Sequence, residues 1–121
     1  MIIYTRLYAD NLGQSHFADI EIDLMLTDYA PPAPPLELSS ITPAKQFGFM
    51  NAPAGWVSDW HPASERNIFF VLSGEWEVTA SDGETRRFSA GSVLRVEDTT
   101  GKGHSSRVVS DSLAVMVELD E

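Results

Sequence analysis

The chain has 121 residues, with 8 lysines and arginines against 18 acidic residues, and a formal net charge of −10. So acidic a chain lacks the basic stripe that phosphate binding requires, and we expect no nucleic-acid partner. It contains no cysteine, which excludes disulfides, thiolate metal sites and a cysteine nucleophile. The length suits one domain. Because we find neither a signal-peptide pattern nor a long apolar run, we expect a cytoplasmic protein with no membrane partner.

The predicted elements are all strands, because apolar residues alternate with polar ones or form short runs between turn signals. No segment has the i, i+3, i+4, i+7 apolar spacing of an amphipathic helix. This pattern predicts an all-β sandwich or barrel. In chain order, we expect strands at residues 2–8, 20–26, 45–51, 55–61, 67–73, 75–81, 85–89, 92–97, 104–109 and 112–119.

Glycine and proline mark the connections between these strands. Asp82-Gly83 lies between two strand-like runs and predicts a tight hairpin in which the glycine has a positive φ. Gly74 and Gly91 are expected to end strands. The proline-rich run at Tyr29–Pro35 cannot donate the hydrogen bonds of a ladder, so we expect a stiff connector packed along the barrel.

A spaced pattern of glycine and histidine occupies residues 55–74. Gly55 is followed after five residues by His61, and Gly74 closes the pattern. The pattern resembles the first motif of the cupin family, Gly-x5-His-x-His-x3-Glu-x6-Gly. Ala63 replaces the second histidine and Asn67 replaces the glutamate. The resemblance implies an RmlC-like double-stranded β-helix, a jelly-roll barrel that binds a ligand in its mouth.

Residues 91–104 resemble the second cupin motif, Gly-x5-Pro-x-Gly-x2-His-x3-Asn, less closely. Counted from Gly91, His104 comes two positions late. A two-residue insertion restores the Gly-x-x-His spacing through Gly101 and His104, with Val108 in the place of the asparagine. The single domain, 1–121, then divides into N-terminal strands with the connector, the two motifs and a C-terminal strand, at residues 1–54, 55–108 and 109–121.

The resemblance also implies that His61 and His104 face each other across a pocket. In metal-binding cupins, such histidines and a glutamate hold one divalent ion, for which imidazole suits Fe, Mn, Ni or Zn. Here the metal ligands would be His61, His104 and Asn67, with His16 as a further imidazole. We do not favour a metal, because this ligand set is weak. Without one, the catalytic residues would be His61 and His104, acting as general acid and base.

Other residues are expected to contact the ligand. Alternation along the strand that follows Asn67 points Phe69 and Val71 inward, and Phe70 and Leu72 outward. We also expect Phe47 and Phe49 to lie on one face of a strand that forms a wall of the barrel. The outward apolar residues imply a second apolar layer, and we expect a homodimer. The predicted ligand-binding residues are Asn67, Phe69, Trp60, Glu97 and Arg107.

Charged residues of the second motif have alternative roles. The acid that complements a histidine base would be His104, Glu97 or Asp98. Arg107 would orient a carboxylate of the ligand or pair with Glu97. Glu97, Asp98 and Lys102 also fit a solvated loop at the barrel mouth.

The sequence therefore predicts a cupin that binds a small polar acid or a sugar-like molecule. Whether it is an enzyme stays open. The alternatives are a metal-dependent oxygenase or decarboxylase, a metal-free isomerase or lyase, and a non-catalytic binding module.

Overall fold

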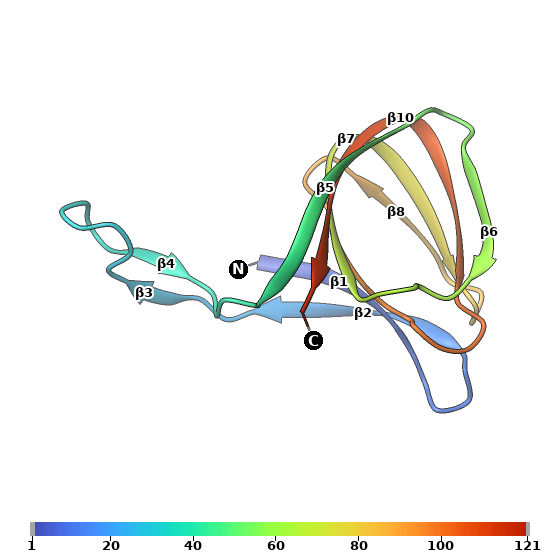
Figure 1. The fold of residues 1–121 in the computed structure, drawn as a ribbon, viewed down its shortest axis with the longest axis horizontal. Helices are drawn as coiled ribbons and strands as arrows, with labels where there is room; N and C mark the ends of the chain where they lie inside the picture. The colour runs from blue at the N-terminus through green and yellow to red at the C-terminus, as the bar shows by residue number, and fades with distance from the viewer. Residues whose placement is uncertain (1, 121) are drawn as a thin grey trace.

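The computed structural model describes residues 2–120, which form strands and loops without a helix. Figure 1 shows a rolled body from which a two-stranded arm projects. No part of residues 2–120 forms a helix long and apolar enough to cross a membrane. The strands are β1 (Ile2–Ala9), β2 (Ser15–Ile22), β3 (Met25–Thr27), β4 (Leu36–Leu38), β5 (Ala44–Ala52), β6 (Val57–His61), β7 (Asn67–Ala80), β8 (Thr85–Ser89), β9 (Val93–Glu97) and β10 (His104–Leu119).

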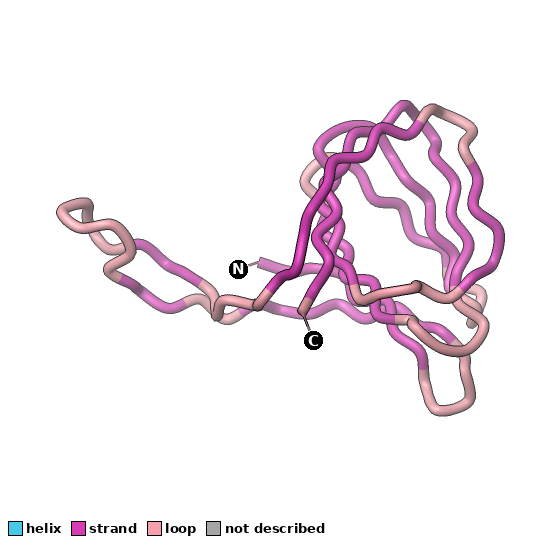
Figure 2. The backbone as a smooth tube through the Cα atoms, in the orientation of Figure 1, coloured by secondary structure: helices cyan, strands magenta, loops and turns pink. Residues whose placement is uncertain are grey.

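Eight of these strands form one sheet that curls into the body (Figure 2). The order is β2-β1-β9-β7-β10-β5, while β8 pairs with β7 and β6 pairs with β10. β1 and β9 are parallel, and the other pairs are antiparallel. β7 and β10 change neighbours along their lengths, so the sheet folds back over itself. The predicted all-β barrel is confirmed.

Two strands are longer than the sequence predicts. β7 and β10 each join two predicted strands, 67–73 with 75–81 and 104–109 with 112–119. Gly74 explains the continuation of β7, because its φ is +77° and an added Cβ would lie 2.2 Å from the carbonyl oxygen of Asp111 on β10. Glycine therefore lets the strands approach and bend where a strand end was expected. The predicted Asp82-Gly83 hairpin joins β7 to β8, with Gly83 at a φ of +96°.

β3 and β4 form the projecting arm as a separate two-stranded sheet. The prediction of one strand over 20–26 is wrong, because β2 ends at Ile22 and β3 begins at Met25. The predicted packing of Tyr29–Pro35 along the barrel is also wrong. This segment connects β3 to β4 at the far tip of the arm (Figure 1).

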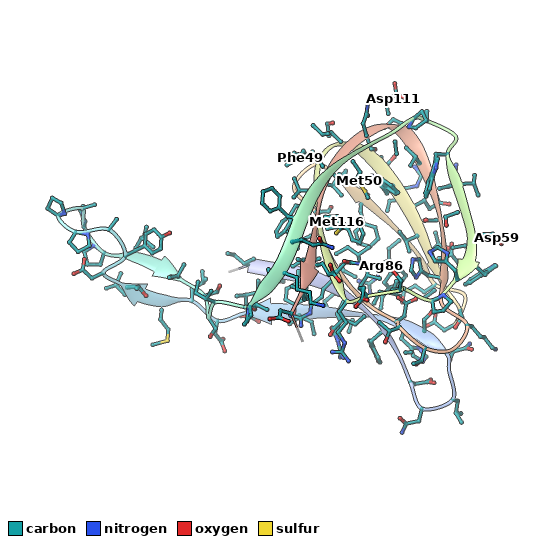
Figure 3. The ribbon with its side chains drawn as sticks, in the orientation of Figure 1. Phe49, Met50, Asp59, Arg86, Asp111 and Met116 are labelled. Carbon is teal, nitrogen blue, oxygen red and sulfur yellow. The ribbon has the colours of Figure 1, made fainter. Side chains whose placement is uncertain are left out.

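Side chains at alternate positions fill the inside of the body. Phe70 and Leu72 are 37% and 50% exposed, which confirms their predicted outward direction on β7. Phe47 and Phe49 share one face of β5, a strand of the body as predicted, and they are 69% and 70% exposed. They lie on the outer face of β5, where Figure 3 shows Phe49 pointing away from the body. The buried core consists of Leu7, Phe17, Ala63, Val71, Val78, Ala80, Phe88, Leu94 and Val96.

Candidate functional site

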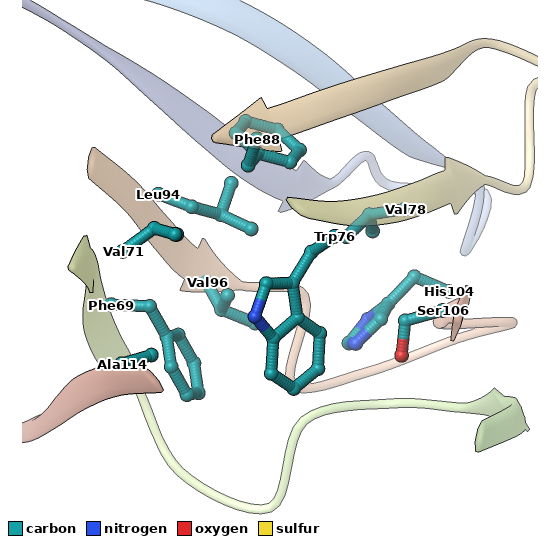
Figure 4. Close-up of a pocket in the computed structure, with 10 residues that line it drawn as sticks. All are labelled: Phe69, Val71, Trp76, Val78, Phe88, Leu94, Val96, His104, Ser106 and Ala114. Carbon is teal, nitrogen blue, oxygen red and sulfur yellow. The ribbon is translucent and has the colours of Figure 1, made fainter. Parts of the chain in front are cut away.

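A small cavity lies inside the body, with walls contributed by β7, β8, β9 and β10 (Figure 4). Its volume is about 80 Å³. Eight of the ten lining residues are apolar, and the other two are His104 and Ser106. Such a lining suits a compact ligand with few polar groups. The apolar lining residues are Phe69, Val71, Trp76, Val78, Phe88, Leu94, Val96 and Ala114.

A close approach between β10 and β6 places His104 beside His61. The two residues pair in the sheet, and their ring centroids are 5.0 Å apart. Gly103 has a φ of +74°, and an added Cβ would lie 2.0 Å from the carbonyl oxygen of His61. Only a residue without a side chain permits that approach. Gly103 therefore sets the position of the imidazole that follows it.

A buried carboxylate orients His104. Its Nδ1 lies 2.6 Å from Oδ2 of Asp98, whose side chain is fully buried, while the His104 side chain is 12% exposed. Because a carboxylate only accepts hydrogen bonds, Nδ1 donates, and the neutral ring carries its lone pair on Nε2. The same relation exists in a catalytic triad, where the carboxylate holds the tautomer and stabilises the imidazolium that forms on proton uptake.

The indole N–H of Trp76 is a buried donor with no hydrogen-bond partner within residues 2–120. Trp56 packs edge-to-face against this indole, with ring centroids 5.8 Å apart and an interplanar angle of 67°. Figure 4 shows the indole between Phe69 and His104. Buried donors in proteins are nearly always paired. The Trp76 N–H is therefore available to an acceptor that enters the cavity.

Among the residues predicted to bind a ligand, Phe69 lines this cavity. Asn67 shares a cross-strand row with the inward Val96, but its amide donates to the carbonyl oxygen of Glu65 at 3.1 Å. Glu97 follows Val96 directly, so strand alternation points it to the outer face. The structure therefore places Asn67 and Glu97 outside the lining of the cavity.

Ion pairs engage the two charged residues that the sequence predicts for the pocket. Glu97 accepts hydrogen bonds from Arg6 at 2.6 Å and from Arg66 at 3.2 Å. Arg107 donates to both oxygens of Glu77, at 2.9 and 3.1 Å, instead of pairing with Glu97. The hydrogen bond from Arg107 is the main cause of the lowered pKa of Glu77. These contacts stabilise the sheet and leave the cavity apolar.

His61 and Trp60 lie at the exposed end of β6. The His61 Nδ1 lies 2.7 Å from the carbonyl oxygen of Asp59, to which it donates when protonated. Trp60 is 49% exposed, and with Arg107 it lines a separate depression on the outer surface. His61 therefore contacts the ring of His104 without lining the cavity itself.

His16 joins two loops through carboxylates. Its Nε2 lies 2.7 Å from Asp10 in the β1–β2 loop, and its Nδ1 lies 2.9 Å from Asp82 in the β7–β8 hairpin. The hydrogen bonds to Asp10 and then to Asp82 are the main causes that raise the pKa of His16. The bond to His16 is likewise the main cause that lowers the pKa of Asp10. Because both ring nitrogens are engaged, His16 has none left for a metal or a ligand.

The divalent metal that the cupin resemblance implies does not fit these residues. Within residues 2–120, no three His, Asp or Glu side chains gather as a metal-binding group. Ala63, in the place of the second motif histidine, is buried and supplies no donor. The Asn67 amide donates to Glu65, and Nδ1 of His104 already binds Asp98. Two imidazoles alone are a weak ligand set for a transition metal.

The part of the sequence that surrounds the cavity matches a known protein family. Residues 48–120, from within β5 to the end of β10, match the Cupin domain family. The chain therefore belongs to the cupins, as the two motifs indicate, and its jelly-roll fold follows from this membership. Compared with curated proteins, the sequence has no match.

Solved structures share this fold at low sequence identity. A cupin-2 domain containing protein from Shewanella frigidimarina has a TM-score of 0.50 and 18% identity, and the match covers 62% of this chain and 70% of the Shewanella protein. A protein of unknown function from Streptococcus pyogenes has a TM-score of 0.51 and 22% identity, and the match covers 64% of this chain and 67% of the Streptococcus protein. A protein from Neisseria meningitidis has a TM-score of 0.50 and 16% identity, with 83% of each chain covered. These similarities show the fold alone.

Three residues in or beside the cavity have roles that the sequence does not assign to them. The second motif offers Asp98 only as one of three candidate acids, although Asp98 continues the inward alternation of Leu94 and Val96. That alternation is a usable signal for its burial. No comparable signal identifies Trp76 or Ser106 as polar groups of the cavity, because their partners depend on how distant strands meet.

Proposed function

We propose that the cavity binds a small, mainly apolar molecule with one oxygen acceptor, and that His104 moves a proton on this ligand. The observation that carries the proposal is the buried Asp98–His104 pair, which shares an apolar cavity with the unpaired N–H of Trp76. A cavity of about 80 Å³ suits a compact ketone. It suits the sugar-like ligand less well, because each hydroxyl group would lose its water without gaining a partner.

The chemistry that these residues support is removal of a proton from a carbon next to a carbonyl group. Nε2 of His104 accepts the proton, the C–H electron pair forms a carbon–carbon double bond, and negative charge develops on the carbonyl oxygen. The Trp76 N–H donates a hydrogen bond to that oxygen, and Asp98 stabilises the imidazolium. Return of the proton to the same carbon regenerates the ketone. In a β,γ-unsaturated ketone the charge also spreads to the γ-carbon, and return of the proton there moves the double bond and isomerises the ligand.

Binding can be tested by NMR with a matched pair of probes. Titration with cyclopentanone should move the Trp76 Nε1–H resonance downfield, because a hydrogen bond forms to the carbonyl oxygen. Cyclopentane has the same ring without the acceptor and should cause no downfield movement. A Trp76 resonance that stays unchanged at saturating cyclopentanone would contradict the binding proposal.

Catalysis can be tested by deuterium exchange at the α-carbons of cyclopentanone in D₂O. The protein should accelerate the exchange, and His104→Gln should abolish that acceleration. Asp98→Asn should slow it by roughly 10²-fold to 10⁴-fold, because the imidazole loses its tautomer and its counter-charge. His16→Gln alters a histidine–carboxylate cluster outside the cavity and should leave the rate unchanged. Binding without exchange would favour a non-catalytic binding module.

A further inference from the structure

The first residue of β2, Ser15, is fully buried and lies outside the region that matches the cupin family. The match begins at residue 48, so β1, β2 and the loop that joins them are additional to it. The Ser15 residue is 0% exposed. Burying a hydroxyl group costs free energy unless the group is hydrogen-bonded. The stability of this arrangement therefore depends on the partners of the Ser15 hydroxyl.

The Ser15 hydroxyl joins two loops of the body. It donates to the carbonyl oxygen of Gly103 at 2.7 Å and accepts a hydrogen bond from the backbone N–H of Ser81, also at 2.7 Å. The Ser81 hydroxyl in turn accepts from the backbone N–H of Ser15 at 2.6 Å. These bonds tie the start of β2 to the β7–β8 hairpin and to the end of the β9–β10 loop.

Contacts beside Ser15 hold the same loops together. The backbone N–H of Lys102 donates to the carbonyl oxygen of Gly13 at 2.9 Å, and its Nζ donates to the side-chain oxygen of Gln14 at 3.1 Å. The Gln14 amide donates to the carbonyl oxygen of Ser81 at 2.9 Å. Figure 1 shows the β1–β2 loop beside the β9–β10 loop at one end of the body. The β1–β2 loop therefore braces the β9–β10 loop.

This brace acts on the peptide unit that carries His104. The carbonyl group of Gly103 and the Cα atom of His104 belong to one planar peptide unit, so holding the oxygen fixes the point from which the imidazole projects. The same loop begins at Asp98, whose carboxylate lies 2.6 Å from Nδ1 of the ring. Hydrogen bonds weaken when they lengthen or bend. The geometry of the Asp98–His104 pair therefore depends on the loop that Ser15 holds.

We propose that Ser15 is a positioning residue for His104, and that its hydroxyl, by holding the Gly103 carbonyl oxygen, keeps the imidazole aligned with Asp98. The effect of Ser15 on proton transfer rests on the proposed function of His104. The ten residues that line the cavity do not include Ser15, so its influence on a ligand passes through the imidazole. Through Ser15, strands outside the family match contribute to the candidate site.

NMR of the His104 ring tests this role without any ligand. In Ser15→Ala the Gly103 carbonyl oxygen loses its donor, and the His104 Nδ1–H should exchange with solvent roughly 5-fold to 10-fold faster, as expected for one lost hydrogen bond. The proton resonance should also move upfield as the bond to Asp98 lengthens. Ser15→Cys keeps a side chain of similar size with a weaker donor, so we expect a smaller change in the same direction. An Nδ1–H that is unchanged in both variants would overturn the proposal.

Ser112 supplies a matched control. It is 1% exposed, and its hydroxyl donates to the carbonyl oxygen of Ser110 at 2.8 Å within β10. Ser112→Ala therefore removes another buried hydroxyl without changing a contact of the β9–β10 loop. It should lower the free energy of unfolding and leave the His104 Nδ1–H unchanged. Equal acceleration of Nδ1–H exchange in this control would indicate general loosening and would refute a specific role for Ser15.

Deuterium exchange into cyclopentanone separates this inference from the proposed function. Ser15→Ala should slow the catalysed exchange by roughly 5-fold to 10-fold, whereas Ser112→Ala should not. If the unaltered chain does not accelerate the exchange, the proposed function fails, and the His104 Nδ1–H still reports whether Ser15 positions the ring. A full catalysed rate in Ser15→Ala, despite a loosened Nδ1–H, would contradict the effect of Ser15 on proton transfer.

Discussion

Two histidines of this protein bind carboxylates, and they differ in what the second ring nitrogen does. His104 binds the fully buried Asp98 through Nδ1, and its ring lines the cavity. His16 binds Asp10 through one nitrogen and Asp82 through the other, and its side chain is 30% exposed. A carboxylate partner by itself therefore does not define a reactive imidazole. The ring also needs a nitrogen left for a ligand and a cavity that admits one.

The largest expected effect comes from changing the residue that positions His104. Gly103→Ala places a Cβ 2.0 Å from the His61 carbonyl oxygen at a φ of +74°. The left-handed conformation costs about 1–2 kcal/mol, and separating β6 from β10 should add to that cost. We expect a loss of at least about 2 kcal/mol in the free energy of unfolding, measured in urea.

Gly91→Ala is the matched control for this substitution. Gly91 has a φ of +90°, but an added Cβ would meet no atom within 4 Å. This variant should show only the conformational cost of about 1–2 kcal/mol. Equal losses in the two variants would show that the approach of Gly103 to His61 has no energetic importance.

Removing the buried partner of His104 should have an intermediate effect. Asp98→Ala leaves the Nδ1–H of a largely buried imidazole without its acceptor, which costs about 1–3 kcal/mol. The ring nitrogen resonances of His104 should change from a single Nδ1–H tautomer to a mixture. Nitrogen-15 NMR of the imidazole measures this change. An unaltered tautomer in the variant would contradict the role given to Asp98.

The smallest effect is expected at His16, and it should depend on pH. Because the carboxylates raise the His16 pKa, their contribution is fully present below the ordinary imidazole pKa of about 6.5. It is lost as the pH rises through the folded-state pKa. At low pH, protonation of Asp10, whose pKa is lowered, removes it again. The melting temperature difference between the unaltered chain and His16→Gln should therefore be largest at mildly acidic pH. A difference that does not vary with pH would contradict this assignment.

Much of the fold can be predicted from local patterns. Alternation correctly places Phe69, Val71, Phe70 and Leu72 on the two sides of β7, because the pleat of a strand is a local property. The same reasoning fails at Gly74, where a glycine permits a bend within a strand. It also fails for the arm, because the pattern over 20–26 does not indicate which strand it will pair with.

The sequence by itself determines the all-β class and the cupin motifs, and it predicts His104 as a site residue. The tertiary structure decides that Asp98 holds His104, that the buried Trp76 N–H has no hydrogen-bond partner within residues 2–120, and that Glu97 belongs to an outer ion-pair cluster. The physical reason is the range of the interactions involved. Strand periodicity and turn chemistry act between neighbours in the chain, whereas burial and hydrogen-bond partners depend on where distant strands meet.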